Sequence, residues 1–288
     1  MKFGFTVPNN FGVDDPADVV GLAVRAEELG FDSVWVNHHV LNVGYVWDRL
    51  GERPYHDALV TLTWMAARTS RVRLGTSVLV MPYLHPMVLA KELATLDRLS
   101  GGRLVVGLGV GSLPEENELL GVGYDDRGAL SNEFIEVLNL LWTQSSADFA
   151  GEHYSFTGAV SSPKPLQQPR PPILIGGNRP PALRRVGQLG DGWHPMMLTP
   201  ESVAKRLPVI REAAEAAGRP GVPSEVSVRL GADTLTPALA AEYAAVGVDE
   251  LVISWNSGDV AVISDGLAAF AAEHGIGTPR QRRTAAAT

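Results

Sequence analysis

The chain has 288 residues, of which 45% are apolar and 19% are charged, a balance typical of a globular protein with a large core. Its formal net charge of -8 disfavours binding to nucleic acid or to an anionic membrane surface. Because it contains no cysteine, disulfides, thiolate metal sites and thiol nucleophiles are excluded. We see no export signal and no apolar run of membrane-spanning length, and we expect a cytoplasmic protein.

Strand-like runs alternate with helical patterns along the chain, which predicts βα units around a parallel sheet. Asp15 and Pro16 open the first helix and Gly30 closes it, in agreement with capping preferences. A long polar loop over 40–54 follows the second strand and is long enough to be functional. The first four strands are predicted at 2–7, 33–37, 73–80 and 104–108, and the helices behind the last three at 57–68, 86–99 and 126–142.

The stretch 147–172 breaks this rhythm, because Tyr154 and Phe156 indicate a hairpin and several prolines follow. We interpret it as a short insertion after the fourth βα unit. The series then resumes with strands at 173–175, 192–194, 226–230 and 251–254, and with helices at 180–189, from Thr199 and Pro200 onward, at 237–246 and at 260–274. Eight units predict one closed (β/α)8 barrel over 1–277, with 278–288 as a flexible tail. An open, doubly wound sheet would carry a phosphate fingerprint after its first strand, and none is present.

In such a barrel the active site lies at the carboxyl ends of the strands. His38 and His39 follow the second strand, and since adjacent side chains point apart, only one of them can supply a proton. The alternative is that both merely bind loop backbone. Gly107, Gly109 and Gly111 follow the fourth strand, where missing side chains allow a flat ring or a phosphate to approach, although a simple turn explains them almost as well.

The loop of Gly176, Gly177 and Asn178 lies between the fifth strand and a helix that begins near Pro180. Backbone N–H groups at a helix start bind anions, so this loop is a predicted phosphate site. No metal site is expected, because no known ligand spacing is present.

Other chemistries fit the residues less well. A GxSxG motif is absent, so hydrolysis through an acyl-enzyme is disfavoured. Glycoside hydrolysis by Glu115, Glu116 or Glu118 is a distant alternative, because nothing indicates a second carboxylate. Among the large aromatic residues we expect core positions for Trp35, Trp64 and Trp142, and pocket positions for Trp193 and Tyr83.

Several segments in order along residues 1–200 resemble one family. They read MKFGFTVPN, RAEELGFDSVWVNHH, TSRVRLGTSVLVMPYLHP, ATLDRLSGGRLVVGLGVG, PPILIGGN and LGDGWHP. This chain resembles the luciferase-like monooxygenase superfamily, in particular its deazaflavin-dependent branch. The resemblance implies a barrel that binds the deazaflavin F420 or FMN, with the ring against a bulge that contains a non-prolyl cis peptide at Ser77 and Val78.

The resemblance also assigns expected roles to individual positions. His39 matches the catalytic histidine of the sugar-phosphate dehydrogenases in this branch. Ser112 stands where those enzymes carry a glutamate and His38 where they carry an aspartate, so a different proton route or reaction is expected. Expected cofactor contacts are His38, Ser77, Val78, Val80, Val110, Gly111, Gly176, Gly177, Asn178 and Arg179.

The leading hypothesis is an F420-dependent oxidoreductase that moves a hydride between the deazaflavin and an unidentified small organic substrate, with His39 as proton donor or acceptor. One alternative is an FMN-dependent monooxygenase that uses reduced flavin and oxygen. Another is a flavin- or deazaflavin-binding protein without turnover. By family resemblance we expect a homodimer.

Overall fold

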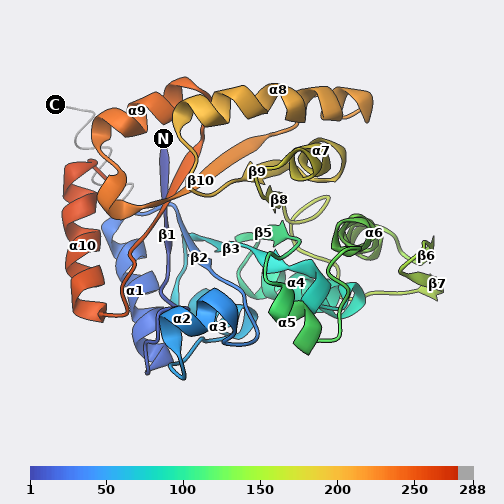
Figure 1. The fold of residues 1–288 in the computed structure, drawn as a ribbon, viewed down its shortest axis with the longest axis horizontal. Coiled ribbons are helices and arrows are strands. Elements are labelled where there is room, and N and C mark those ends of the chain that lie inside the picture. Colours follow the sequence, from blue (N-terminus) through green and yellow to red (C-terminus); the bar gives the residue numbers. More distant parts are fainter. Residues whose placement is uncertain (278–288) are drawn as a thin grey trace.

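The computed structural model describes residues 1–277, which form a closed barrel of parallel strands surrounded by helices (Figure 1). In one direction β1 pairs with β11, and in the other β3 pairs with β5, so the sheet has no open edge. The predicted barrel is therefore confirmed, whereas the predicted tail lies outside the described residues. The barrel strands are, in spatial order, β1 (Lys2–Thr6), β2 (Ser33–Val36), β3 (Arg73–Thr76), β5 (Leu104–Gly109), β8 (Ile173–Gly176), β9 (Gly192–His194), β10 (Glu225–Gly231) and β11 (Glu250–Ser254).

Helices connect these strands and cover the outside of the barrel, where most of the apolar core lies. The predicted caps are present: the Asp15 side chain accepts from the amide of Ala17 at 2.8 Å, and Gly30 has φ 99° in the left-handed region. No helix within residues 1–277 is both long and apolar enough to cross a bilayer. The covering helices are α1 (Pro16–Leu29), α3 (Ala58–Arg68), α4 (Pro86–Leu99), α6 (Arg127–Thr143), α7 (Pro180–Leu189), α8 (Pro200–Ala216), α9 (Pro237–Ala245) and α10 (Val260–Glu273).

One indole ring fills the middle of the barrel. Trp35 of β2 is fully buried and clusters with apolar side chains of three other strands. A Cβ on Gly75 of β3 would lie 2.1 Å from Trp35 Cε3, and a Cβ on Gly4 of β1 would lie 2.9 Å from Trp35 Nε1. The two glycines thus provide the volume that the indole ring occupies. The interior of the barrel is therefore a packed core, and its open end lies at the carboxyl ends of the strands.

Charged residues close the amino end of the barrel. Arg73 and Glu225 form a bidentate pair, with Nη1–Oε1 at 2.5 Å and Nη2–Oε2 at 2.8 Å. The hydroxyl of Ser33 donates to Oε1 of the fully buried Glu250 at 2.5 Å. Burial raises the pKa of Glu250 to about 7, although the charge of Arg73 acts in the opposite direction.

The structure differs from the prediction mainly where loops meet the open end. The third strand, expected over 73–80, is split into β3 and β4 (Leu79–Val80). Two short helices, α2 (Gly44–Leu50) and α5 (Pro114–Leu119), lie within segments that were expected to be loops, and the 3-10 turns η1 (Met81–Tyr83) and η2 (Ala232–Thr234) were not predicted. The expected hairpin is present as the antiparallel pair β6 (Ala147–Ala150) and β7 (Ser155–Ala159), which projects from one side of the barrel (Figure 1).

Two aromatic predictions were wrong. Trp64 was expected in the core, but its side chain lies on the outer face of α3 and is 38% exposed. Trp193 was expected to line a pocket, but it is completely buried. Trp35 and Trp142 are core residues as predicted.

Candidate active site

The two histidines that follow β2 face different partners, as expected of adjacent residues. Nδ1 of His38 accepts a hydrogen bond from the backbone amide of Val80 at 3.0 Å. Burial is the largest influence on His38 and lowers its pKa to about 4. An imidazole that is neutral and accepts at Nδ1 carries its proton on Nε2. His38 therefore fixes β4 and stays uncharged at neutral pH.

His39 lies between an acid and a phenol. Its Nδ1 is 2.6 Å from Oε2 of Glu116, and its Nε2 is 2.7 Å from the hydroxyl of Tyr45. The other oxygen of Glu116 accepts from the amides of Val40 at 2.6 Å and Leu41 at 3.0 Å. A carboxylate next to Nδ1 requires a donor there, so neutral His39 carries its proton on Nδ1 and accepts from Tyr45 at Nε2.

Glu116 is a residue of this site that the sequence did not single out. Ser112 stands at the position of the family glutamate, so a different proton route was expected, and the acid that lies next to His39 is Glu116. The short helix α5 buries the Glu116 side chain completely and directs it to His39. Burial raises the pKa of this carboxyl, but hydrogen bonds from His39, Leu41 and Val40 outweigh burial and lower it below the ordinary value. Glu116 is therefore ionised at neutral pH.

The position of α5 is itself fixed by a residue that we had expected to line a pocket. Tyr83 is half-buried, and its hydroxyl lies 3.0 Å from Oδ1 of Asn117, the neighbour of Glu116. The phenol thus holds the helix that carries the acid. Arg127 stacks on the ring of Tyr124, with its guanidinium carbon 3.6 Å from the ring centre.

Arg229 of β10 extends across the mouth of the barrel toward Asn37 and Ser77. Its Nη1 donates to Oδ1 of Asn37 and lies 3.4 Å from the carbonyl oxygen of Ser77. Nε2 of His194 is 2.9 Å from Oγ of Ser77, and the His194 ring stacks on Trp35 with 4.6 Å between centres. Burial lowers the pKa of Arg229 to about 10 and that of His194 to about 3. At neutral pH the arginine is charged and this histidine is neutral.

Ser77 and Val78 are joined by a cis peptide bond, at the position that the family resemblance implied. The Val78 side chain projects between glycines of the neighbouring strands. A Cβ on Gly109 would lie 2.5 Å from Val78 Cγ2, and one on Gly176 would lie 3.2 Å from Val78 Cγ1. Larger residues on β5 and β8 would displace the bulge. The absence of side chains at these two glycines therefore makes room for Val78 in the bulge.

The loop after β8 is held open by a buried indole. Nε1 of Trp193 donates to the carbonyl oxygen of Gly177 at 2.8 Å, and Gly177 has φ 99°. This explains why Trp193 is not in the pocket: it supports the loop from below. Its position was predicted from the strand end alone, which does not specify on which side of the loop the ring lies.

Free backbone amides are found in this loop and not in the first turn of the helix that follows it. Pro180 and Pro181 occupy the first turn of α7 and have no N–H, and the amide of Ala182 is bonded to Arg179 O at 2.9 Å. Within residues 1–277, no backbone hydrogen bond uses the amides of Gly177, Asn178 or Arg179. The loop amides, and not those of the helix, are therefore the groups that could hold a phosphate.

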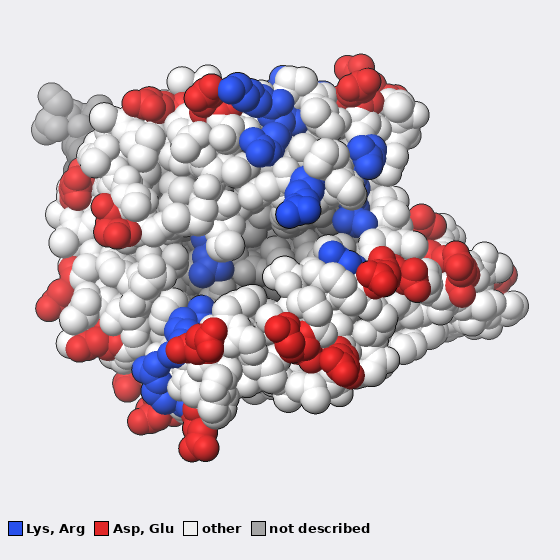
Figure 2. Space-filling model, in the orientation of Figure 1, with Lys and Arg blue, Asp and Glu red and all other residues white. Residues whose placement is uncertain are grey.

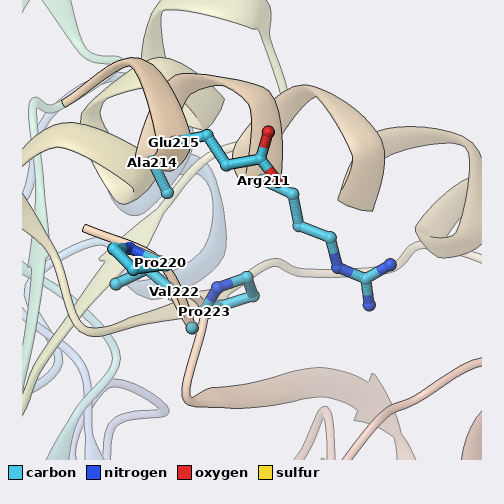
Figure 3. A pocket seen from close by; sticks show the side chains of 7 residues that line it. Arg211, Ala214, Glu215, Pro220, Val222 and Pro223 are labelled. Atoms are coloured by element: carbon cyan, nitrogen blue, oxygen red, sulfur yellow. The ribbon is translucent and has the colours of Figure 1, made fainter. Parts of the chain in front are cut away.

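The remaining predicted positions surround the same opening. Val80 is buried in β4, Val110 is half-buried directly after β5, and Gly111 has φ 78°. A hollow lies in the middle of the face shown in Figure 2, in front of the strands that form the barrel in Figure 1. A separate hollow of 290 Å³ lies beside the end of α8 and is lined by residues that include Arg211 and Pro223 (Figure 3). Because Pro223 precedes β10, this second hollow is at the amino end of the barrel, away from the histidines.

The fold and this arrangement define a (β/α)8 barrel with an acid–histidine–phenol constellation at the carboxyl ends of its strands. The family model described as "Luciferase-like monooxygenase" matches residues 1–246. The chain belongs to the luciferase-like monooxygenase family.

The chain is similar in sequence to proteins of other organisms. It is 37% identical over 215 residues to the F420-dependent glucose-6-phosphate dehydrogenase of Kineococcus radiotolerans, a match that covers 71% of this chain and 60% of the relative. It is 35% identical over 220 residues to an uncharacterised protein of Mycobacterium tuberculosis, with 74% of this chain and 75% of the relative covered. The match thus spans less than two thirds of the curated dehydrogenase.

Solved structures share the fold at low sequence identity. An F420-dependent secondary alcohol dehydrogenase in complex with an F420-acetone adduct superposes with a TM-score of 0.80 at 18% identity, covering 94% of this chain and 97% of that one. A monooxygenase from Streptomyces bottropensis has a TM-score of 0.78 at 24% identity, covering 95% and 98%. At these sequence identities the structural similarity shows the barrel fold alone. The chemistry has to be inferred from the residues of the site.

Proposed function

We propose that this protein is an F420-dependent oxidoreductase that transfers a hydride between the deazaflavin and a small organic substrate. The observation that carries the proposal is the hydrogen-bonded series Glu116–His39–Tyr45 at the barrel mouth, with distances of 2.6 Å and 2.7 Å. The sequence relatives with dehydrogenase names support the choice of cofactor. Bound F420 would supply the hydride acceptor or donor, and the protein would supply placement and a proton path.

The proposed roles follow from the geometry. The backbone around Ser77 and Val78 would support the ring, and the loop amides of Gly177, Asn178 and Arg179 would hold a cofactor phosphate. His38, Val80, Val110, Gly111 and Gly176 border the same opening and are proposed as further contacts.

Proton transfer is the task of His39. Removing a hydride from a hydroxyl-bearing carbon also releases the hydroxyl proton, which Nε2 of His39 would accept directly or through the Tyr45 hydroxyl. Glu116 would stabilise the resulting imidazolium and keep the ring in the required tautomer, as the acid of a catalytic triad does. His39 is thus the proposed catalytic residue, with Glu116 as its positioning residue.

Cofactor titration tests this proposal. F420 is expected to bind at least about tenfold more tightly than FMN, measured by fluorescence of the cofactor. The outcome that favours the alternative, an FMN-dependent monooxygenase, is the reverse order of affinity. Tight binding of F420 without turnover of candidate alcohols by the wild type would instead indicate a binding protein without catalysis, and unchanged turnover in His39→Ala would remove His39 from the proton path.

A pair of glycine variants localises the cofactor. Gly177→Ala strains a residue with φ 99° in the proposed phosphate loop, and its Cβ would lie 3.0 Å from Ala182 Cβ. Gly247→Ala imposes a comparable strain at φ 91°, with nothing within 4 Å, on the loop before β11 at the opposite end of the barrel. Only the first variant is expected to weaken F420 binding, whereas both are expected to lower stability by about 1 kcal/mol.

We also propose that the protein is a cytoplasmic homodimer. An apolar surface on the neighbouring helices α3 and α4 supports dimerisation: Val60 is 72% exposed, Val88 57% and Trp64 38%. Light scattering is expected to give the mass of a dimer for the wild type and of a monomer for Val60→Glu. A monomeric wild type would remove this part of the proposal.

A further inference from the structure

Two arginines at the barrel mouth have no acidic partner. Among residues 1–277, the ion pairs within 4.0 Å involve neither Arg49 nor Arg229. Elsewhere the barrel satisfies its buried arginines: Arg73 pairs with Glu225, and Arg103 directs Nε, Nη1 and Nη2 to backbone and side-chain oxygens. Arg49 and Arg229 are both half-buried, and an arginine partly removed from water without a counter-ion indicates a charged ligand.

Arg229 is held on one side only. All hydrogen bonds of its side chain start from Nη1 and end on Asn37 and Ser77, at distances of up to 3.5 Å. Nε and Nη2 have no partner in the described part of the chain. The guanidinium is therefore anchored against the cis-peptide bulge with N–H donors left over.

Tyr55 and Arg49 contribute two further donors. The hydroxyl of Tyr55 and Nε of Arg49 are buried and, within residues 1–277, have no hydrogen-bond partner. The Tyr55 ring packs edge-on against His39 with 6.0 Å between centres, so its hydroxyl belongs to the same site. Arg49 lies on α2 one turn after Tyr45, whose hydroxyl is 2.7 Å from His39 Nε2, and its guanidinium carbon is 4.9 Å from the centre of the Phe11 ring.

The charge distribution agrees with this local picture. The protein carries a formal net charge of -8, yet Lys and Arg side chains border the central hollow in Figure 2. Positive charge around a recess in an otherwise acidic protein attracts small anions.

We infer that Arg229, Arg49 and Tyr55 form a binding site for an anionic oxygen group, carboxylate or phosphoryl, next to His39. Two sources could supply such an oxygen: an acidic group on the substrate, or the oxygen-bearing edge of the reduced deazaflavin ring. The role of the site in turnover rests on the proposed function. Binding of an anion to the site does not depend on the proposed function, because it requires only side chains of this protein.

Calorimetric titration of cofactor-free protein with acetate and with inorganic phosphate, in chloride-free buffer, tests the inference. We expect saturable binding of at least one anion, weakened about tenfold or more in Arg229→Gln and about threefold or more in Tyr55→Phe. Arg211→Gln, at the hollow of Figure 3, is the matched control and is expected to bind as the wild type does. Tyr55→Phe removes a single oxygen and so tests the site even if Arg229→Gln fails to fold.

Absence of saturable binding, or equal affinity in the wild type and both mouth variants, would overturn the inference. Repeating the titration with F420-loaded protein separates the two sources. Retained anion binding assigns the site to the substrate, and loss of binding assigns it to the ring. If F420 does not bind at all, the proposed function fails while the anion titration of the cofactor-free protein still stands.

Discussion

Glu116→Gln tests the constellation on which the proposed chemistry depends. The carboxylate accepts from three donors, which are Nδ1 of His39 at 2.6 Å, Val40 N at 2.6 Å and Leu41 N at 3.0 Å. Glutamine has the same shape, but its amide offers one oxygen and one NH2 group. Either His39 must change tautomer to accept from that NH2, or a backbone amide loses its acceptor. In both cases the arrangement around His39 is broken.

The stability cost can be estimated from these bonds. A hydrogen bond to a charged group contributes about 1.5 to 3 kcal/mol, so replacing the carboxylate is expected to cost about 2 to 4 kcal/mol near neutral pH. The folded-state pKa of Glu116 is lowered, so this stabilisation is present above its ordinary pKa of 4.5 and is lost as pH falls through the folded-state value. The wild type and the variant are therefore expected to converge in stability under acidic conditions.

Urea denaturation near neutral pH and at about pH 3, well below the ordinary pKa, measures the difference, and nitrogen NMR of the His39 ring reports the tautomer. Turnover with F420 is expected to fall about 100- to 1000-fold. Glu115→Gln is the matched control, because Glu115 is the exposed neighbour on the same helix. The reasoning is refuted if Glu115→Gln costs as much stability, or if the deficit of Glu116→Gln is equally large in acid.

Three further predictions concern the phenol next to His39, the packing inside the barrel and the titration of Glu250. Tyr45→Phe removes only the hydroxyl at 2.7 Å from His39 Nε2, so turnover is expected to fall about 10- to 100-fold with little change in Tm. Gly75→Ala places a Cβ 2.1 Å from Trp35 Cε3 and is expected to lower the free energy of unfolding by more than about 3 kcal/mol in urea denaturation. Gly21→Ala is the control, because nothing lies within 4 Å of the added Cβ on the exposed face of α1, and it should raise the free energy of unfolding by up to about 1 kcal/mol. The pKa of Glu250 is raised to about 7 in the folded state, so wild-type stability should decline as pH rises from the ordinary value of 4.5 through 7, and Glu250→Gln should abolish that decline.

Each of these has a result that contradicts it. An unchanged rate in Tyr45→Phe would remove the phenol from the proton path. Equal stabilities of the two glycine variants would mean that the barrel interior accommodates an extra methyl group. The same pH slope in Glu250→Gln and the wild type, between about pH 5 and about pH 8, would assign the titration to another group.

Local signals made most of the fold predictable. Asp15 and Gly30 mark the ends of α1 because capping depends on residues within one turn of the helix. The prediction of a core position for Trp64 was wrong because this residue shares an outward face of α3 with Val60. Apolar residues surround much of that helix, so the periodicity of the sequence could not identify its buried side.

The site was only partly predictable for a different reason. His39 and the cis peptide could be placed because they follow strands and match family segments. The contact between His39 and Glu116 spans 77 positions in the chain and depends on how two loops fold over the barrel. A glutamate near a glycine-rich loop was visible in the sequence, but nothing local distinguished Glu116 from Glu115 or Glu118. The only available signal was a buried position opposite a strand-end histidine, which requires coordinates.

His39 and its two partners lie on different kinds of structural element, and this arrangement has an evolutionary consequence. The histidine is attached to a rigid strand end, whereas Tyr45 and Glu116 are carried by the two short inserts α2 and α5. Loops of a barrel tolerate insertion, deletion and exchange far better than its strands do. A descendant gene could therefore acquire a new acid or a new proton donor by recombining a single loop. The scaffold that holds the flat ring would be inherited untouched.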